Sequence, residues 1–119
     1  MENWYVRPVF FVRNCAEAIK FYRSIGFYEK WKSEEAGKIV AAQLNLNGIE
    51  LILNENESKA GKGRLFISLA RGKVKEYLSS IKNKQLDIED LFWGIPTKAI
   101  KDIDGNDILF YDDDLVVNK

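Results

Sequence analysis

The sequence predicts an α+β fold in which two modules, each ordered strand-helix-strand-strand-strand, form a curved mixed sheet around a cleft. The same order of elements occurs twice along the 119 residues, and a polar loop at 55–63 divides the two halves. Arg7 precedes Arg64 by the same 57 positions that separate Val9 from Phe66. We therefore expect one domain over residues 1–119, with the first repeat at about 6–54 and the second at about 64–112.

The first repeat is predicted to begin with a strand at 6–12, in which Arg7, Val9 and Phe11 face one side. Pro8 cannot donate to a β-ladder, so the strand should have an irregular or exposed edge there. A helix should follow, because Asn14 is a typical N-cap with Glu17 reaching back to it. The apolar face of this helix comprises Ala18, Phe21, Tyr22 and Ile25, and Gly26 should end it. The remaining elements are expected to be strands at 27–32, 39–46 and 49–53, with turns at 33–38 and at Asn47-Gly48.

The second repeat is predicted to follow the same plan. Its helix shows an apolar face at helical spacing, and its last strand follows the narrow turn Asp104-Gly105-Asn106-Asp107. Phe92-Trp93-Gly94 is expected in a loop. The predicted elements are strands at 64–69, 87–91, 97–101 and 108–111, and a helix with Val74, Tyr77, Leu78 and Ile81 on its apolar face.

The composition excludes several classes of function. The 18 basic and 18 acidic residues cancel, and no basic stripe is interleaved with aromatic residues, so we expect neither a nucleic-acid partner nor a membrane surface. The chain contains no histidine, which removes Ser-His-Asp catalysis and histidine-based metal sites. The single cysteine, the lack of a signal-peptide pattern and the absence of a long apolar run lead us to expect a cytoplasmic protein.

Two motifs carry a resemblance to a known family. Val12-Arg13-Asn14, followed by Ala18 to Tyr22 and Ile25-Gly26-Phe27, resembles the opening of the vicinal oxygen chelate superfamily. Asp102-Ile103-Asp104-Gly105-Asn106-Asp107-Ile108 resembles its closing motif. That superfamily includes glyoxalase I, extradiol dioxygenases and bleomycin-resistance proteins, and the resemblance covers essentially the whole chain.

The resemblance implies four positions that hold a divalent metal in the enzymes of the family. They fall on Arg7, Glu50, Arg64 and Leu109. Only Glu50 offers a ligand atom, because guanidinium groups and a leucine side chain cannot coordinate a cation. We therefore expect no metal and no other cofactor, and we expect the metal-dependent reactions of the family to be absent.

Among the members of the family, the chain is most similar to the metal-free bleomycin-resistance proteins, and Trp93-Gly94 resembles a Trp-Gly pair that they carry. This implies a homodimer that sequesters a drug or toxin in an aromatic-lined cleft, with no catalytic residue. The alternative is a glyoxalase-like lyase or isomerase with a non-standard site. A third possibility is a protein that only dimerises.

The candidate ligand-binding residues comprise polar anchors, which the resemblance also marks as the metal positions, and aromatic walls. The anchors could form a cationic cluster with one counter-charge that binds an anionic or carbonyl-rich ligand, or a structural ion pair that fills the metal position. Trp93 could stack on a planar ligand or pack on a dimer partner. The candidates are Arg7, Phe11, Glu50, Arg64, Phe66, Trp93 and Tyr111.

Three residues have interpretations besides ligand binding. Cys15 lies near a helix N-terminus, where the dipole favours a thiolate, but a small buried residue is the commoner role. Tyr111 could serve as a general acid beside the former metal position. Trp4 is expected to anchor the N-terminus.

Overall fold

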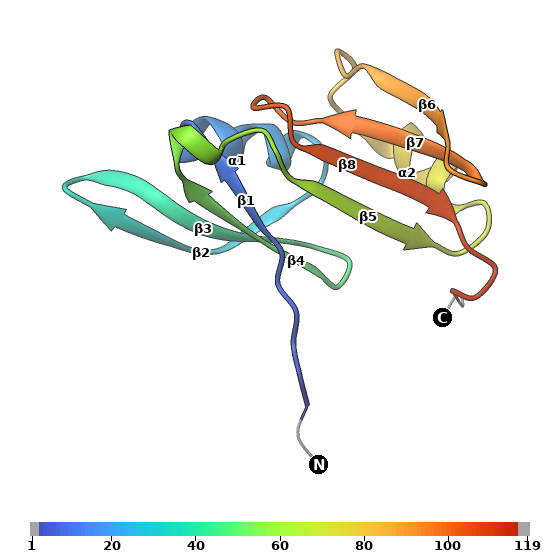
Figure 1. The fold of residues 1–119 in the computed structure, drawn as a ribbon, viewed down its shortest axis with the longest axis horizontal. Helices are drawn as coiled ribbons and strands as arrows, with labels where there is room; N and C mark the ends of the chain where they lie inside the picture. Colours follow the sequence, from blue (N-terminus) through green and yellow to red (C-terminus); the bar gives the residue numbers. More distant parts are fainter. Residues whose placement is uncertain (1–2, 117–119) are drawn as a thin grey trace.

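The computed structural model describes residues 3–116 of the chain, and these residues form two similar modules (Figure 1). The first module contains β1 (Val9–Val12), α1 (Cys15–Ser24), β2 (Tyr28–Glu35), β3 (Lys38–Leu46), β4 (Ile49–Glu55) and the short 3-10 helix η1 (Glu57–Lys59). The second module contains β5 (Arg64–Leu69), α2 (Lys73–Ser80), β6 (Ile88–Phe92), β7 (Pro96–Lys101) and β8 (Asp107–Asp112).

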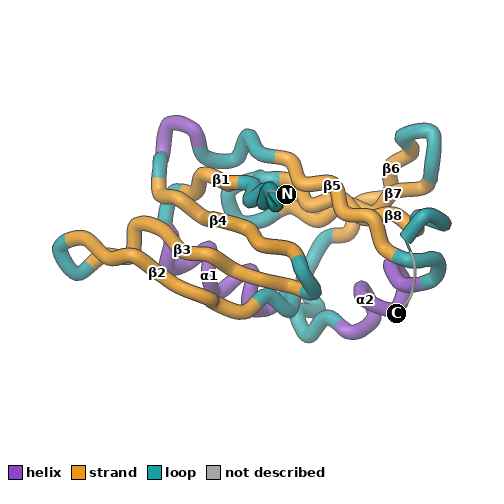
Figure 2. The backbone as a smooth tube through the Cα atoms, turned by 90° about the horizontal axis from the view of Figure 1, so that it is seen from below, coloured by secondary structure: helices purple, strands orange, loops and turns teal. Residues whose placement is uncertain are grey.

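Each module builds a four-stranded mixed sheet, with the order β1-β4-β3-β2 in the first and β5-β8-β7-β6 in the second. The first strand of each module pairs parallel to the last, and the other pairs are antiparallel. Both helices lie on one side of the two sheets, which leaves the other side open (Figure 2). The doubled βαβββ prediction is therefore confirmed. Among the described residues, no helix is long and apolar enough to span a membrane.

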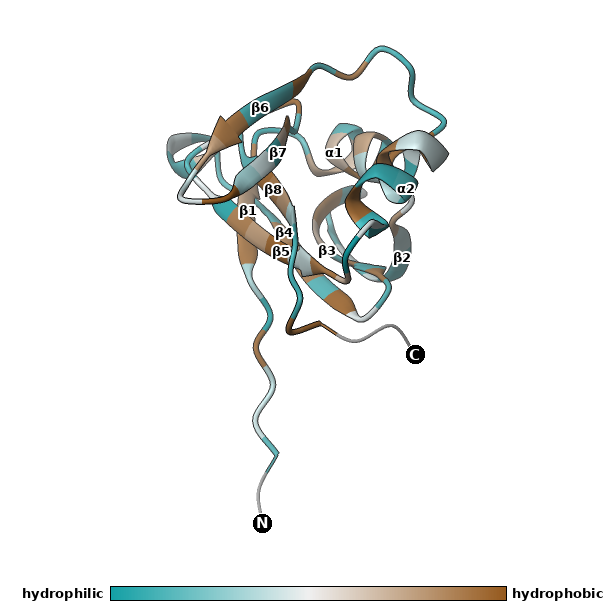
Figure 3. Ribbon diagram, turned by 90° about the vertical axis from the view of Figure 1, so that its right-hand side faces the viewer, coloured by the Kyte–Doolittle hydropathy of each residue, from teal (hydrophilic) through white to brown (hydrophobic). Residues whose placement is uncertain are grey.

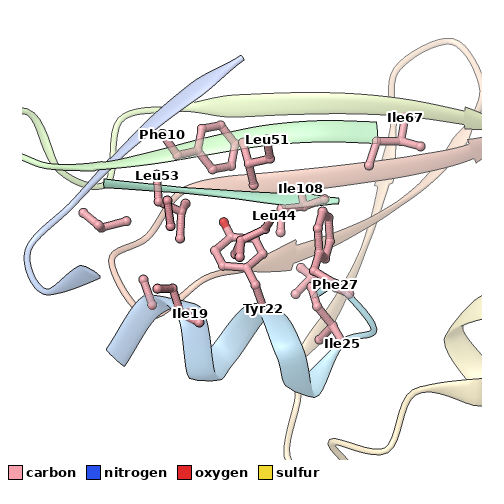
Figure 4. Packing of buried hydrophobic residues seen from close by; sticks show 14 of the residues in the cluster. Phe10, Ile19, Tyr22, Ile25, Phe27, Leu44, Leu51, Leu53, Ile67 and Ile108 are labelled. Atoms are coloured by element: carbon pink, nitrogen blue, oxygen red, sulfur yellow. The ribbon is translucent and has the colours of Figure 1, made fainter. Parts of the chain in front are cut away.

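The core lies between α1 and the first sheet and continues under the second sheet (Figure 4). Ala18, Ile19 and Tyr22 on α1 pack against Leu44 and Leu51, all of them buried. The helix begins as predicted, because the Asn14 side chain accepts a hydrogen bond from the backbone N–H of Glu17. Gly26, with φ at 108°, directly follows its C-cap.

The first strand is shorter than predicted. It begins at Val9, and the residues before it run as an extended arm away from the two sheets (Figures 1 and 3). The arm meets the sheet at Pro8, whose carbonyl oxygen accepts a hydrogen bond from Ile52 N–H at 2.9 Å. The Trp4 side chain is 87% exposed, so the prediction that it anchors the N-terminus to its own chain is wrong.

The second and third strands are longer than predicted. The segment at 33–38 was expected to be a turn because it is polar, but β2 continues to Glu35 and β3 begins at Lys38. Only Ala36 and Gly37 turn, both with positive φ. This hairpin extends beyond the core, where no apolar face is required, so composition alone does not mark its strands.

The closing motif joins the two modules through buried and part-buried hydrogen bonds. The Tyr22 hydroxyl of α1 donates to Asp102 Oδ2 at 2.8 Å. The Asn106 side-chain amide donates to the Phe11 carbonyl at 3.1 Å, and its Oδ1 accepts from Gly63 N–H at 2.8 Å. Burial, together with the Asp102 carboxylate, raises the pKa of Tyr22 well above its ordinary value. We call Tyr22, Asp102 and Asn106 the junction network.

Candidate ligand-binding site

The open face of the first sheet carries a row of polar side chains. Leu44 and Leu51 point toward α1, and neighbouring residues in a strand face opposite sides, so Gln43, Asn45 and Glu50 point to the open face. The register pairs Asn45 with Glu50 across β3 and β4. The side chains of this row therefore lie close together on one surface.

Hydrogen bonds link these side chains into what we call the polar cluster, made of Arg7, Trp31, Gln43, Asn45 and Glu50. Arg7 Nε donates to Glu50 Oε1 at 3.1 Å, and Gln43 Nε2 donates to the same oxygen at 3.0 Å. Gln43 also donates to Asn45 Oδ1 and accepts from Trp31 Nε1. Sequence reasoning missed Gln43 and Asn45. Their alternation with leucines along β3 was the signal that could have found them.

The open face of the second sheet carries an aromatic cluster, made of Phe66, Trp93 and Tyr111. The Phe66 and Trp93 rings are nearly parallel, with 4° between their planes and 5.6 Å between their centroids. The centroids of the Phe66 and Tyr111 rings are 4.7 Å apart. Phe66 and Trp93 remain 41% and 48% exposed, so a flat molecule has access to them. The structure thus brings together three of the predicted residues.

Arg64 lies beside the aromatic cluster and forms an ion pair with Asp107. Its guanidinium carbon lies 5.7 Å from the centre of the Trp93 ring, and its Nε lies 3.4 Å from Asp107 Oδ2. Lys101 Nζ donates to the same carboxylate at 2.6 Å, which raises the pKa of Lys101. Each of the two arginines is thus paired with a separate carboxylate, Arg7 with Glu50 and Arg64 with Asp107.

Asp107 was missed by sequence reasoning although the repeat offers a signal for it. The register places Arg64 opposite Asp107, and Arg7, extending β1 by two residues, contacts Glu50 in the equivalent way. The 57-residue offset that relates Arg7 to Arg64 also relates Glu50 to Asp107. Leu109 instead lies opposite Phe66 and is buried.

The donor set does not fit a divalent metal at the position that the family's enzymes use. Of Arg7, Glu50, Arg64 and Leu109, only Glu50 has a ligand atom, and one of its oxygens already accepts hydrogen bonds from Arg7 and Gln43. Within residues 3–116, no three His, Cys, Asp or Glu side chains come together in a metal-binding arrangement. We therefore derive no reaction step through a metal.

Phe11 and Tyr111 are each engaged by a neighbour. The Lys59 ammonium lies 5.2 Å from the centre of the Phe11 ring. The Tyr111 hydroxyl donates to Asp113 Oδ2 at 2.7 Å. Hydrogen bonds from Leu115 N–H and then from Tyr111 keep the pKa of Asp113 below its ordinary value. The Tyr111 ring thus packs beside Phe66 while its hydroxyl donates to Asp113.

Cys15 takes the structural role. It is fully buried, and burial, followed by the charges of Glu55 and Glu29, raises the pKa of its thiol to about 11. The dipole effect on the thiol is therefore outweighed, and the interpretation of Cys15 as a reactive thiolate is wrong.

Two cavities lie beside the helices, and their linings include Lys101 in one and Tyr111 in the other. One of about 540 Å³ is lined by residues that include Phe21 and Leu86, and another of about 480 Å³ is lined by residues that include Val74 and Phe110. Arg7 and Trp31 of the polar cluster are exposed to solvent, as are Phe66 and Trp93 of the aromatic cluster, whereas Gln43 is buried. A ligand on these clusters would need a second wall to be enclosed.

A two-module α+β chain with both helices on one side and an open face lined by such clusters defines a class of small binding proteins and enzymes. The model of the Glyoxalase/Bleomycin resistance protein/Dioxygenase superfamily matches residues 4–114, and the chain belongs to this family. The predicted resemblance is therefore confirmed. A comparison with curated proteins by sequence finds no match.

Solved structures show the same fold at low sequence identity. The bleomycin-binding protein of Streptomyces verticillus, complexed with copper(II)-bleomycin, is 14% identical over 95% of this chain and 98% of its own, with a TM-score of 0.69. The bleomycin resistance determinant of transposon Tn5 is 16% identical over 95% of this chain and 100% of its own, with a TM-score of 0.66. A glyoxalase family protein from Bacillus anthracis is 18% identical over 92% and 97%, with a TM-score of 0.67.

Proposed function

We propose that this protein is a metal-free binding protein that sequesters a small drug or toxin molecule on its open face. The observation that carries the proposal is the half-exposed, nearly parallel pair of Phe66 and Trp93 rings beside Arg64. Exposed aromatic rings in a fixed parallel arrangement are suited to a planar ligand. Relatives of the same fold that bind bleomycin support the sequestering role.

Binding alone would supply the activity. A flat ligand stacks on Trp93 and Phe66, while Arg7 and Glu50 provide hydrogen bonds from the first sheet. Stacking on an aromatic ring adds about 1 kcal/mol beyond the burial of apolar surface. The ligand is kept from its target in proportion to the amount of protein, and no bond is made or broken.

The proposal includes a homodimer in which a second copy completes the cleft. The arm before β1 carries Trp4, Tyr5 and Val6, of which Trp4 and Val6 are 87% and 86% exposed. Three large apolar side chains in an extended segment are unusual on the surface of a monomer. Docking of this arm on a second copy would cover them, and two-fold symmetry would cover both arms equally.

Replacing Trp4 and Val6 together by serine is expected to weaken dimerisation at least tenfold, because the apolar surface of the arm would no longer be buried. Sedimentation equilibrium of the variant and the wild-type protein measures the dissociation constant. Ile103→Ser is the control, because Ile103 is also exposed but lies outside the arm. An unchanged dissociation constant for the arm variant, or a monomeric wild-type protein, would remove the arm from the proposal.

The ligand-binding proposal is tested with N-phenyl-1-naphthylamine, a neutral aromatic probe that fluoresces in apolar sites, and with bleomycin as a competitor. We expect saturable binding of the probe. Trp93→Ala and Phe66→Ala should each weaken it about tenfold, equivalent to about 1.4 kcal/mol.

Phe92→Ala is the matched control. Phe92 directly precedes Trp93 and is more exposed, but strand alternation directs it away from the open face. Equal binding by the wild-type protein and Trp93→Ala would contradict the proposal. The enzymatic alternative would gain support if purified protein held a stoichiometric divalent metal that Glu50→Gln removed.

A further inference from the structure

We propose that the ligand is an aromatic molecule carrying a carboxylate or a similar oxyanion, that the free Nη groups of Arg64 recognise this group, and that Arg7 offers an equivalent group on the first sheet. The inference rests on the proposed function, because it names the chemical class bound on the same open face. It is carried by the repetition of one arrangement in both modules.

Both modules place an arginine and a carboxylate at equivalent positions of their sheets. Arg7 Nε lies 3.1 Å from Glu50 Oε1 in the first module, and Arg64 Nε lies 3.4 Å from Asp107 Oδ2 in the second. In each pair the arginine comes from the first strand or just before it, and the acid comes from the last strand. The two modules thus share this pair on the open face although they differ in most of their sequence.

Each arginine contacts its carboxylate through Nε and leaves its Nη atoms available to bind a ligand. The guanidinium group has five N–H donors, and the Nε edge faces the acid. Across residues 3–116, no hydrogen bond engages the Nη atoms of Arg7 or Arg64, and both side chains are exposed to solvent. Two Nη groups in a plane form the fork that binds carboxylate or phosphate oxygens in a bidentate manner.

An aromatic ring orients each guanidinium group. The guanidinium carbon of Arg7 lies 5.3 Å from the centre of the Tyr5 ring, and that of Arg64 lies 5.7 Å from the centre of the Trp93 ring. A guanidinium group held against a ring keeps a fixed plane and is weakly hydrated. A ligand ring that stacks beside Trp93 would carry its carboxylate toward the Arg64 fork.

At Asp107, beside Trp93, two positive charges meet one negative charge. Asp107 is shared by two cations, Arg64 and Lys101. Glu89 acts on Lys101 more weakly than Asp107 does. A cationic ligand placed on Trp93 would meet the Arg64 charge directly, whereas a carboxylate would replace water on its free Nη groups.

Isothermal titration calorimetry with three naphthalene derivatives of similar shape tests the inference. The probes are 2-naphthoate, the neutral 2-naphthalenemethanol and the cationic 2-naphthylmethylammonium. We expect the carboxylate to bind at least tenfold more tightly than the alcohol, equivalent to about 1.4 kcal/mol, and the ammonium to bind most weakly.

Variants of Arg64 separate its charge from its fork. Arg64→Gln should reduce the preference for the carboxylate over the alcohol to less than about threefold, because the charged contact is lost. Arg64→Lys, which keeps the charge without the fork, should give an intermediate preference. Arg71→Gln is the charge-matched control, because Arg71 is paired with Asp114 outside the proposed site.

The outcomes distinguish this inference from the function on which it rests. If the alcohol binds as tightly as the carboxylate and Trp93→Ala still weakens both, the aromatic site stands and the inference is overturned. The inference is also overturned if Arg64→Gln leaves the preference unchanged while retaining the wild-type thermal unfolding profile. If none of the three probes binds, the proposed function fails together with the inference.

Discussion

Replacing Asn106 by alanine is expected to lower the free energy of unfolding by about 3–4 kcal/mol, a large fraction of the stability of a domain of this size. Asn106 is fully buried and belongs to the junction network. Its side chain makes hydrogen bonds to groups from three separate segments, which are the Phe11 carbonyl, Gly63 N–H and Asp102 Oδ2. The substitution would remove a hydrogen-bond partner from all three groups, of which the Asp102 contact is buried and the other two are part-buried.

The size of this effect follows from the cost of an unsatisfied buried polar group. Each such group costs about 1–3 kcal/mol, whereas an exposed hydrogen bond that water replaces costs much less. Some relaxation and water entry would reduce the sum. Asn106→Asp should be at least as harmful at neutral pH, because its new carboxylate oxygen would face two acceptors, the Phe11 carbonyl and Asp102.

Urea denaturation followed by circular dichroism measures the change. Asn54→Ala is the matched control, because Asn54 is an exposed asparagine on β4, and its substitution should change the free energy of unfolding by less than about 0.5 kcal/mol. Similar losses for the two variants would show that the junction network contributes little to stability.

The junction network also lies next to the candidate site. Asn106 is adjacent to Asp107, Gly63 is adjacent to Arg64, and the acceptor carbonyl belongs to Phe11 itself. Because the network holds backbone from both modules, it fixes the backbone positions from which the side chains of Phe11, Arg64 and Asp107 extend. The motif that identifies the family in the sequence thus has a structural task here, which is to join the two modules beside their open face.

Local patterns in the sequence predicted the elements that have local causes. The Asn14 cap, the Gly26 stop and the helical spacing of Ala18 and Tyr22 depend on residues within one turn of each other, and all were confirmed. The prediction of a turn over the whole of 33–38 was wrong, because the strands of this polar hairpin are stabilised by pairing with each other rather than by burial.

The candidate site was predicted in part for the same physical reason. Phe66 and Tyr111 share a face through strand alternation, which the sequence displays. The stacking of Trp93 on Phe66 depends on how the β6–β7 hairpin returns over the sheet, and no local pattern reports that. The arm before β1 could not be predicted either, since hydrophobic residues such as Trp4 are ordinarily expected to pack on their own chain.

Replacing Gly61 by alanine is expected to lower the free energy of unfolding by about 4 kcal/mol or more, or to prevent folding. Gly61 lies between η1 and β5 with φ at 79°, a conformation that costs an L-residue about 1–2 kcal/mol. A Cβ atom there would lie 2.1 Å from the Asp104 carbonyl oxygen. This oxygen belongs to the backbone of the closing turn, so a side-chain rotation cannot relieve the overlap.

Gly48→Ala separates the clash from the conformational strain. Gly48 has φ at 88°, but a Cβ atom there would meet nothing within 4 Å, so its substitution should cost only the strain of about 1–2 kcal/mol. Urea denaturation of both variants gives the difference directly. Equal losses would mean that the turn at Asp104 moves aside freely, and the two modules would then be less firmly joined than the junction network implies. A markedly greater loss for Gly61→Ala would place the tightest backbone contact between the modules at Gly61 and Asp104.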